Sequence, residues 1–260
     1  MTLFNQDIKT IESAPGVFTG TVSENWLVNG NPNGGYLMAL MTRAILARND
    51  NMRTPIVTAN YIARCVPGPV QIRIEQISST KQFQRFEARL FQEEKVRVLA
   101  TFALENNECV INRYETPPTP LAPRESCVLI PALPTYTLFE QLDVLLDPAC
   151  AGWMQNRLVD RSENKGWIRF KYGNEYDLLS LLLIADSLPP AVMATHGIVA
   201  WVPTIELSVN IRNLPQSEWL NCCLRTRFIT CGLLEADGEI WDEAGNLIAI
   251  SRQIAQVRKL

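Results

Sequence analysis

The chain has 260 residues, of which 47% are hydrophobic and 20% charged, as is typical of a globular protein. Lys and Arg number 24 against 27 Asp and Glu, so a net charge of −3 provides no broad basic surface for nucleic acid. The longest dense apolar stretch, residues 178–185, is far shorter than the roughly 20 residues that span a bilayer. The first twelve residues lack the apolar core of a signal peptide. We therefore expect a cytoplasmic protein with no nucleic-acid or membrane partner.

Cysteine and histidine usage excludes several further classes of site. The seven cysteines are odd in number and form no C-x-x-C motif, so we expect reduced thiols and no metal site. His196 is the only histidine and no G-x-S-x-G elbow accompanies it, which disfavours a serine hydrolase triad. The glycine-rich run at residues 30–35 lacks the lysine of a P-loop and the spacing of a dinucleotide-binding loop.

The first half begins with a turn-rich stretch at residues 28–35, which must end whatever precedes it. Residues 36–48 then predict a helix that is apolar almost all round and therefore buried. Four strand-like runs follow, several with alternating apolar residues, separated by Pro-Gly, Ser-Thr-Lys and Glu-Glu-Lys turns. We place these strands at residues 56–66, 70–79, 82–91 and 96–104.

The second half repeats this order after a proline-rich stretch at residues 106–137, which we interpret as an ordered, irregular linker. A buried helix at residues 177–187 ends at Pro189 and Pro190, where a helix does not readily continue. Strands are predicted at residues 204–212, 220–230, 233–241 and 247–257, with a hairpin turn at residues 242–245 between the last two.

An offset of 148 residues relates the two halves: Pro55 and Arg64 precede Pro203 and Arg212 by that number. A helix followed by four antiparallel strands, twice, indicates two copies of one α+β unit, each a sheet wrapped around a central helix. This is a double hot-dog arrangement, with units at residues 1–105 and 138–260 and the linker at 106–137 between them. The alternative is a chance pattern within one large α+β domain.

Polar residues at three places in the second half lie in apolar surroundings. Asp186 closes a helix of leucines, where the negative end of the helix dipole and burial both disfavour a carboxylate. Thr204 and Glu206 are predicted to share one face of their strand, opposite Leu207. Gln253 lies on a face of small and apolar residues and needs partners for its amide. Each also has an ordinary explanation: a solvated helix end, a good strand former, and a structural hydrogen bond.

An Asp, a Thr and a Gln together can hold a water that attacks an activated carbonyl, with the carboxylate as general base. The segments that carry them, IADSLPPAV, PTIELSV and GEIWDEAGNLIAISRQIAQVR, resemble the TesB-like acyl-CoA thioesterase II family of double hot-dog enzymes, and NGGYLMALMTRA extends the resemblance to the first half. The resemblance implies that Asp186, Thr204 and Gln253 orient the hydrolytic water. It also implies an acyl-CoA substrate, no cofactor beyond the CoA of that substrate, and a homo-oligomer.

The sequence departs from some family members at Glu206 and Leu207, where they carry an Asp-His pair, so their acyl specificity cannot be transferred. At the repeat offset, the first half has apolar residues in place of the trio, which predicts one catalytic centre per chain. Asn33, Gly34 and Gly35 precede the first buried helix, whose free N–H groups could receive the thioester carbonyl oxygen, or they merely form a tight turn.

Two rival functions stay open at this stage. A non-catalytic acyl-CoA binder or regulator would keep the ligand groove without needing the trio. A hydratase or dehydratase of the same fold would need a histidine beside a carboxylate, and His196 follows the second helix rather than lying within it.

Overall fold

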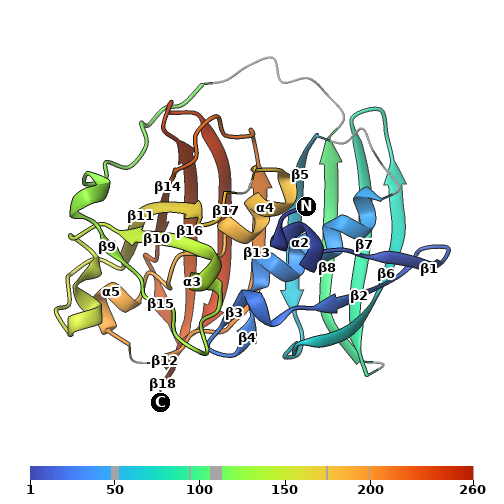
Figure 1. Cartoon of the computed structure of the whole chain (residues 1–260), viewed down its shortest axis with the longest axis horizontal. Helices are drawn as coiled ribbons and strands as arrows, with labels where there is room; N and C mark the ends of the chain where they lie inside the picture. The colour runs from blue at the N-terminus through green and yellow to red at the C-terminus, as the bar shows by residue number, and fades with distance from the viewer. Residues whose placement is uncertain (48–52, 94, 106–112, 174, 199, 260) are drawn as a thin grey trace.

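The computed structural model describes residues 1–47, 53–93, 95–105, 113–173, 175–198 and 200–259. One large antiparallel sheet runs through both halves of the chain (Figure 1). Among the described residues it contains 14 strands. In spatial order these are β1 (Ile11–Ala14), β2 (Val17–Val22), β6 (Gly68–Ser79), β7 (Phe83–Gln92), β8 (Lys95–Glu105), β5 (Arg53–Tyr61), β13 (Thr204–Ile211), β17 (Leu247–Gln256), β16 (Leu233–Asp242), β14 (Leu220–Arg225), β11 (Glu163–Phe170), β10 (Leu142–Leu146) and β9 (Val128–Leu129), with β15 (Ile229–Thr230) paired to β16.

Two buried helices, α2 (Gly34–Leu46) and α4 (Leu178–Ile184), lie on the same side of this sheet (Figure 1). The sheet curls around them, which confirms the double hot-dog arrangement. The described residues contain no helix long and apolar enough to span a membrane. The remaining elements are short: α1 (Leu3–Asp7), α3 (Leu138–Gln141), α5 (Met193–His196), the 3-10 helices η1 (Glu24–Trp26), η2 (Arg124–Ser126) and η3 (Ala151–Gln155), and the strand pairs β3 (Leu27–Val28) with β4 (Asn31–Pro32) and β12 (Ala200–Trp201) with β18 (Arg258–Lys259).

The two halves join where β5 pairs with β13. Ala59 lies opposite Leu207 and Val57 opposite Val209, and all four side chains are buried. Since residues directly opposite each other share a face of the sheet, these side chains mark its inner face, which packs on the helices. The joint therefore places residues from both halves against the same pair of helices.

The helix α2 begins two residues earlier than predicted because the side chain of Asn33 caps it. The Asn33 Oδ1 accepts a hydrogen bond of 2.8 Å from the N–H of Tyr36, which allows Gly34 and Gly35 to take helical geometry. In α4, Asp177 and Ser180 form a reciprocal capping box. Both helices are thus fixed at the end where the chain enters them. Residue 48 of the predicted first helix lies outside the described residues.

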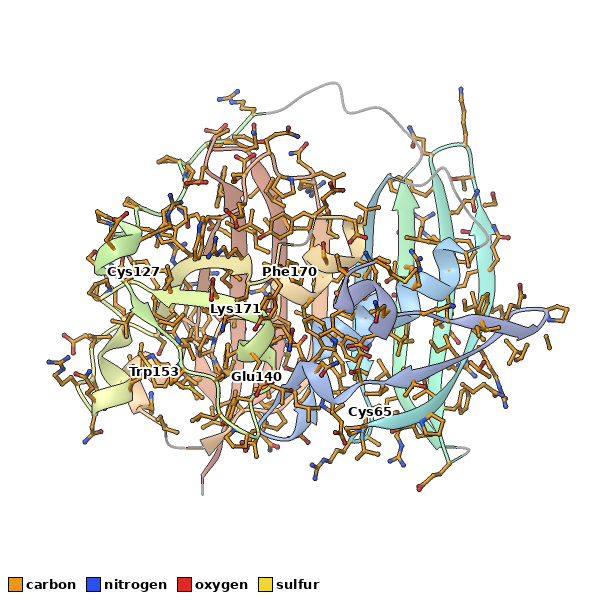
Figure 2. The ribbon with its side chains drawn as sticks, viewed as in Figure 1. Cys65, Cys127, Glu140, Trp153, Phe170 and Lys171 are labelled. Atoms are coloured by element: carbon orange, nitrogen blue, oxygen red, sulfur yellow. The ribbon has the colours of Figure 1, made fainter. Side chains whose placement is uncertain are left out.

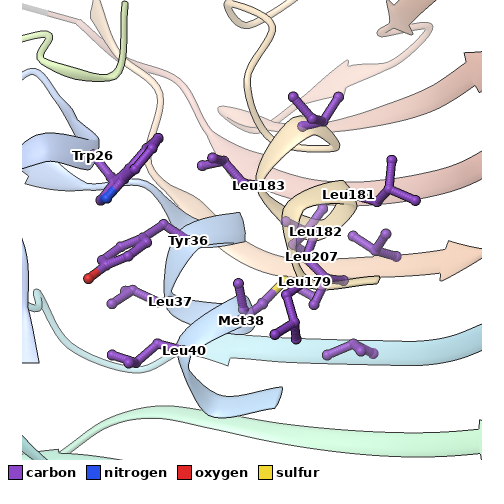
Figure 3. Close-up of a cluster of buried hydrophobic side chains, with 14 of the residues drawn as sticks. Trp26, Tyr36, Leu37, Met38, Leu40, Leu179, Leu181, Leu182, Leu183 and Leu207 are labelled. Atoms are coloured by element: carbon purple, nitrogen blue, oxygen red, sulfur yellow. The ribbon is translucent and has the colours of Figure 1, made fainter. Parts of the chain in front are cut away.

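The core lies between the helices and the sheet and between the helices themselves. Leucines of α4 face α2, and Met38 points from α2 towards Leu179 (Figure 3). Leu207 of β13 lies beneath α4 in the same view. Burying side chains of this size contributes roughly 1.5–3 kcal/mol each relative to leaving them exposed. The helices are therefore held firmly at the joint between the halves.

The structure adds strands that the sequence pattern did not predict, the longest being β1, β2, β10 and β11. In β11 the buried positions include Asn164 and Gly166, and Trp167 lies on the outer face. The strand therefore lacks the alternation of apolar and polar residues by which a strand is recognised in a sequence. Phe170 at the end of β11 packs against Phe4 and Trp26 of the N-terminal segment, and Figure 2 shows it near the centre of the molecule. The predicted strand 220–230 is also interrupted, because Arg227 and Phe228 donate their N–H groups to the Glu235 carboxylate.

The predicted hairpin turn at residues 242–245 is confirmed, with Gly245 at φ +80° between β16 and β17. Of the predicted linker, residues 106–112 lie outside the described residues. The part from residue 113 onward crosses the outside of the second half and is tied to it: Thr119 accepts from Asn221, and Ala122 accepts from the indole of Trp167 at 3.0 Å.

Candidate active site

Asp186 follows the C-terminal end of α4 and points at the N-terminal end of α2. Its Oδ2 accepts a hydrogen bond of 3.1 Å from the backbone N–H of Gly35. The main-chain carbonyl of Asp186 accepts a second one, 2.6 Å long, from Asn33 Nδ2. The carboxylate therefore lies at the negative end of the dipole of its own helix, but it is stabilised by the positive end of the dipole of α2. This pairing explains how a leucine-rich helix tolerates an acidic residue there.

Burial raises the pKa of the Asp186 carboxyl to about 6, although hydrogen bonds from the N–H groups of Gly35 and Gly34 lower it in part. A carboxyl with this pKa is mostly ionised at neutral pH and is a stronger base than an ordinary aspartate. General-base catalysis is most efficient when the pKa of the base lies near the working pH. Asp186 therefore has the properties of a general base.

The close approach of the helices requires glycine at positions 34 and 35. A Cβ on Gly35 would lie 2.2 Å from the carbonyl oxygen of Leu182, which is backbone and cannot move aside. A Cβ on Gly34 would lie 2.6 Å from the Tyr61 hydroxyl and 3.0 Å from Asp186 Oδ2. The two glycines thus let the carboxylate reach the helix end.

Thr204 and Gln253 lie on neighbouring strands and contact each other, with Gln253 Nε2 donating to Thr204 Oγ1. Thr204 lies opposite Ala255, and Gln253 lies opposite Leu207. Opposite residues share a face, and Gln253 and Ala255 are two positions apart. All of these residues, Thr204 included, are therefore on the inner face of the sheet.

The prediction that Thr204 and Glu206 share one face, opposite Leu207, is wrong. A bulge separates Thr204 from Glu206, so that Ile205 has no partner of its own in β17. One extra residue reverses the alternation of faces. Thr204 consequently moves to the inner face with Leu207, which the strict alternation of the sequence could not show.

The structure arranges the three predicted residues as two groups. Thr204 and Gln253 form one hydrogen-bonded pair, and Asp186 is held separately by α2. Within the described part of the chain, Asp186 makes no direct hydrogen bond to either member of the pair. Leu207, the neighbour of Gln253 across the sheet, packs beneath α4 (Figure 3), so both groups belong to the same layer between sheet and helices.

Asn33, Gly34 and Gly35 were predicted as the site for the thioester carbonyl. In the structure the Asn33 side chain caps α2 and holds the backbone of Asp186, while the N–H of Gly35 is directed at the carboxylate. A thioester carbonyl would have to share these donors with Asp186. Their observed contacts are with the carboxylate and its main chain.

Tyr61 is a further residue of the candidate site, and the sequence pattern does not indicate it. It ends β5, and its hydroxyl is buried beside Gly34 without a hydrogen-bond partner in the described part of the chain. In the sequence it looks like an ordinary strand residue, since tyrosine is frequent in strands. Only the pairing of β5 with β13 brings it to the helix ends. His196, in contrast, is exposed at the end of α5, and its ring contacts Thr195.

No cluster of three or more His, Cys, Asp or Glu that could hold a metal ion occurs among the residues that the structure describes. The donor set at Asp186 consists of backbone N–H groups, a tyrosine and amides, which suit an anion or a carbonyl rather than a metal ion.

A family model described as the acyl-CoA thioesterase C-terminal domain matches residues 115–257, and one for the acyl-CoA thioesterase N-terminal domain matches residues 22–104. An uncharacterized protein of Mycobacterium tuberculosis, Rv0499, is 23% identical, with 96% of each chain covered.

Two solved structures share the fold over nearly the whole chain. A Thermobifida fusca protein assigned as a thioesterase II aligns with a TM-score of 0.91 and 24% identity, covering 100% of this chain and 98% of its own. The acyl-CoA thioesterase II TesB2 of Mycobacterium marinum aligns with a TM-score of 0.79 and 14% identity, covering 99% and 98%. Together with the family models, which span both halves, these matches lead to one conclusion: the chain belongs to the acyl-CoA thioesterase family, with a TesB-like double hot-dog fold.

Proposed function

We propose that the protein hydrolyses an acyl-CoA to CoA and a free carboxylic acid. The observation that carries this proposal is the Asp186 carboxyl, whose pKa burial raises to about 6, held at the N-terminal end of α2. The family membership supports thioester chemistry in general. The contacts of Asp186, Thr204 and Gln253 support their assignment as the groups that activate water.

In the proposed reaction, a water donates one hydrogen bond to Asp186 and is oriented by the Thr204 hydroxyl and the Gln253 side chain. Asp186 takes a proton as the water oxygen bonds to the thioester carbon, and the carbonyl π electrons move to its oxygen. The tetrahedral species then reforms the carbonyl and breaks the C–S bond. The proton passes from Asp186 to the departing CoA thiolate, so no covalent enzyme intermediate and no metal are needed.

Gln253 and Thr204 have complementary roles in this proposal. Because Gln253 Nε2 donates to Thr204 Oγ1, the Thr204 oxygen already has a donor and its own proton is free to point elsewhere. The carbonyl oxygen of the Gln253 amide remains as an acceptor. The pair thus offers the water one donor and one acceptor at fixed positions. Asn33, Gly34 and Gly35 would act mainly by orienting the Asp186 carboxylate.

A hydratase or dehydratase is disfavoured by the position of the single histidine. His196 is exposed, and its ring nitrogen lies 2.7 Å from the hydroxyl of Thr195. A histidine paired with a catalytic carboxylate would instead lie in the layer between helices and sheet. The cytoplasmic location that we also propose agrees with the free thiols of Cys65, Cys150 and Cys222, which are all buried.

The test is release of CoA from acyl-CoA thioesters of short, medium and long chain and with aromatic acyl groups. Wild type, Asp186→Asn and the exposed control Asp160→Asn are assayed together. We expect turnover by wild type and by the control, and a loss of about 100-fold or more in Asp186→Asn, as removal of a general base implies. If wild type cleaves nothing, yet acyl-CoA raises its melting temperature, the protein is a binder instead.

A further inference from the structure

The hydroxyl of Tyr61 is buried in the candidate active site and has no hydrogen-bond partner among the described residues. It lies close above Gly34, since a Cβ placed on that glycine would stand 2.6 Å from it. The same point is 3.0 Å from Asp186 Oδ2, so the hydroxyl and the carboxylate flank one small region at the N-terminal end of α2. Tyr61 comes from β5 of the first half, whereas Asp186 follows α4 of the second.

An unpartnered buried hydroxyl is costly. Leaving a buried donor without an acceptor costs the whole desolvation free energy of that group, and most buried polar groups in native proteins therefore have partners. A phenylalanine at this position would keep the ring contacts with the core and avoid that cost. The presence of a hydroxyl at this position is explained if a bound ligand supplies the missing hydrogen-bond acceptor.

The surroundings keep this hydroxyl protonated and therefore a donor. Burial, and to a lesser extent the charge of Asp186, raises the pKa of Tyr61 well above its ordinary value. The backbone N–H groups of Gly35 and Gly34, which are the other donors at this helix end, are directed at the Asp186 carboxylate. Of the donors near the N-terminal end of α2, the Tyr61 hydroxyl is thus the one that lacks an acceptor among the described residues.

We propose that the Tyr61 hydroxyl donates a hydrogen bond to the carbonyl oxygen of the bound thioester and stabilises the negative charge that develops on it. This inference rests on the proposed function, because it assumes an acyl-CoA in the site. The carbonyl oxygen would lie next to Gly34, with the carbonyl carbon towards the water activated by Asp186. A neutral, preorganised donor of this kind lowers the barrier without itself losing a proton.

A binding experiment isolates the contact from catalysis. The first probe is a ketone analogue of acyl-CoA, in which a methylene separates the carbonyl from the sulfur so that hydrolysis is impossible. The second is the matching S-alkyl-CoA thioether, which has no carbonyl. Both are made with the acyl chain that wild type prefers, or as a series from short to long if wild type cleaves none. Affinities are measured by calorimetry for wild type, Tyr61→Phe and Tyr176→Phe.

We expect Tyr61→Phe to weaken the ketone analogue about 10-fold and the thioether less than 2-fold, as the loss of one hydrogen bond to the carbonyl implies. In turnover, kcat should fall about 100-fold with KM within 3-fold. Tyr176→Phe is the matched control, because that hydroxyl donates to the carbonyl of Glu218 at 2.8 Å in another part of the fold. It should lower the melting temperature and leave the affinity ratio unchanged.

The outcomes separate this inference from the proposed function. If wild type hydrolyses acyl-CoA and Asp186→Asn does not, but Tyr61→Phe binds both analogues as wild type does, the Tyr61 contact alone is overturned. If wild type hydrolyses nothing, the ratio of its affinities for the ketone and the thioether, compared with that of Tyr61→Phe, still decides whether Tyr61 hydrogen-bonds a ligand carbonyl. If wild type hydrolyses acyl-CoA but binds neither analogue, the Tyr61 contact alone is overturned; if it neither hydrolyses acyl-CoA nor binds either analogue, both proposals are overturned. Misfolding is not expected, since Tyr61→Phe removes only an unpaired hydroxyl and should not lower the melting temperature.

Discussion

The N–H of Gly35 donates a hydrogen bond to Asp186 Oδ2, and this 3.1 Å contact joins the first helix of one half to the carboxylate of the other. Two opposed effects meet in it. Burial favours the neutral acid, whereas the positive end of α2 favours the anion. The result is a base that is ionised at neutral pH and still reactive, and neither half of the chain could produce it alone.

The first prediction concerns pH. Because the proposed mechanism requires the ionised carboxylate, kcat/KM should be low at pH 4.5, rise through a midpoint near pH 6 and level off above pH 7. The midpoint follows from the pKa of Asp186, which burial raises to about 6. The measurement is kcat/KM from pH 4.5 to 8.5 with one acyl-CoA, the enzyme being checked for stability at each pH. A profile that stays flat between pH 5 and 7 would contradict the assignment.

The second prediction concerns stability. Since the folded pKa of Asp186 is raised above its ordinary value of 3.8, folding favours the protonated acid. Stability from this group is fully present below pH 4, falls as pH rises towards 6, and stays reduced above that. Asp186→Asn removes the penalty and can still accept from Gly35. We expect it to be more stable than wild type at pH 8, by an amount on the order of 1 kcal/mol, with a smaller gap at pH 4.

Denaturant unfolding of wild type and Asp186→Asn at pH 4 and pH 8 checks this prediction. Asp160→Asn, at an exposed position, is the control and should show the same stability as wild type at both values. A wild type that is more stable than Asp186→Asn at pH 8 would mean that the ionised carboxylate stabilises the fold, contrary to the desolvation argument.

The third prediction concerns Thr204, whose oxygen accepts from Gln253 Nε2. Thr204→Val keeps the shape but removes the hydroxyl, which leaves the Gln253 amide and the water without a partner. We expect kcat to fall about 10- to 100-fold. Thr204→Ser retains the hydroxyl and should keep most of the activity. Equal losses in the two variants would indicate that packing of the methyl group matters and the hydroxyl does not.

How far the sequence predicts the fold is clear at the joint between the halves. The repeat offset of 148 residues is also the separation of Ala59 and Leu207, which lie opposite each other where β5 meets β13. In this pair, equivalent residues of the two copies face each other across the joint. The two-unit arrangement could be predicted because the same residue types recur at a constant offset in the two halves. The strand β11 could not be found so easily, since its inner face carries Asn164 and Gly166.

The candidate site was predictable only in part. Asp186 conflicts with the preferences of its own helix, and that conflict marks it in the sequence. Its partner Gly35 is 151 positions away, and the meeting of these residues depends on how two helices cross. The inward turn of Thr204 depends on a bulge that leaves no local signal in the sequence. Tyr61 is a strand residue whose unpartnered hydroxyl becomes visible only in three dimensions.

The last prediction tests the crossing of the two helices. Gly35→Ala places a methyl group 2.2 Å from the carbonyl oxygen and 3.0 Å from the carbonyl carbon of Leu182, which belong to the backbone of α4. Overpacking a core typically costs about 1–3 kcal/mol, and a backbone clash belongs at the upper end of that range. The helices must move apart to accept the methyl group, which also lengthens the hydrogen bond to Asp186. We therefore expect a loss of about 3 kcal/mol in stability together with at least a 10-fold loss in activity.

Gly20→Ala is the matched control for this substitution. A Cβ on Gly20 would make ordinary contacts, the nearest being 3.4 Å to a methyl carbon of Thr10. It should change the stability by less than about 1 kcal/mol, as is usual for a substitution without a clash. Denaturant unfolding and CoA release measured on both variants decide the matter. If Gly35→Ala is as stable and active as Gly20→Ala, the helices do not need the close approach that brings Asp186 to α2.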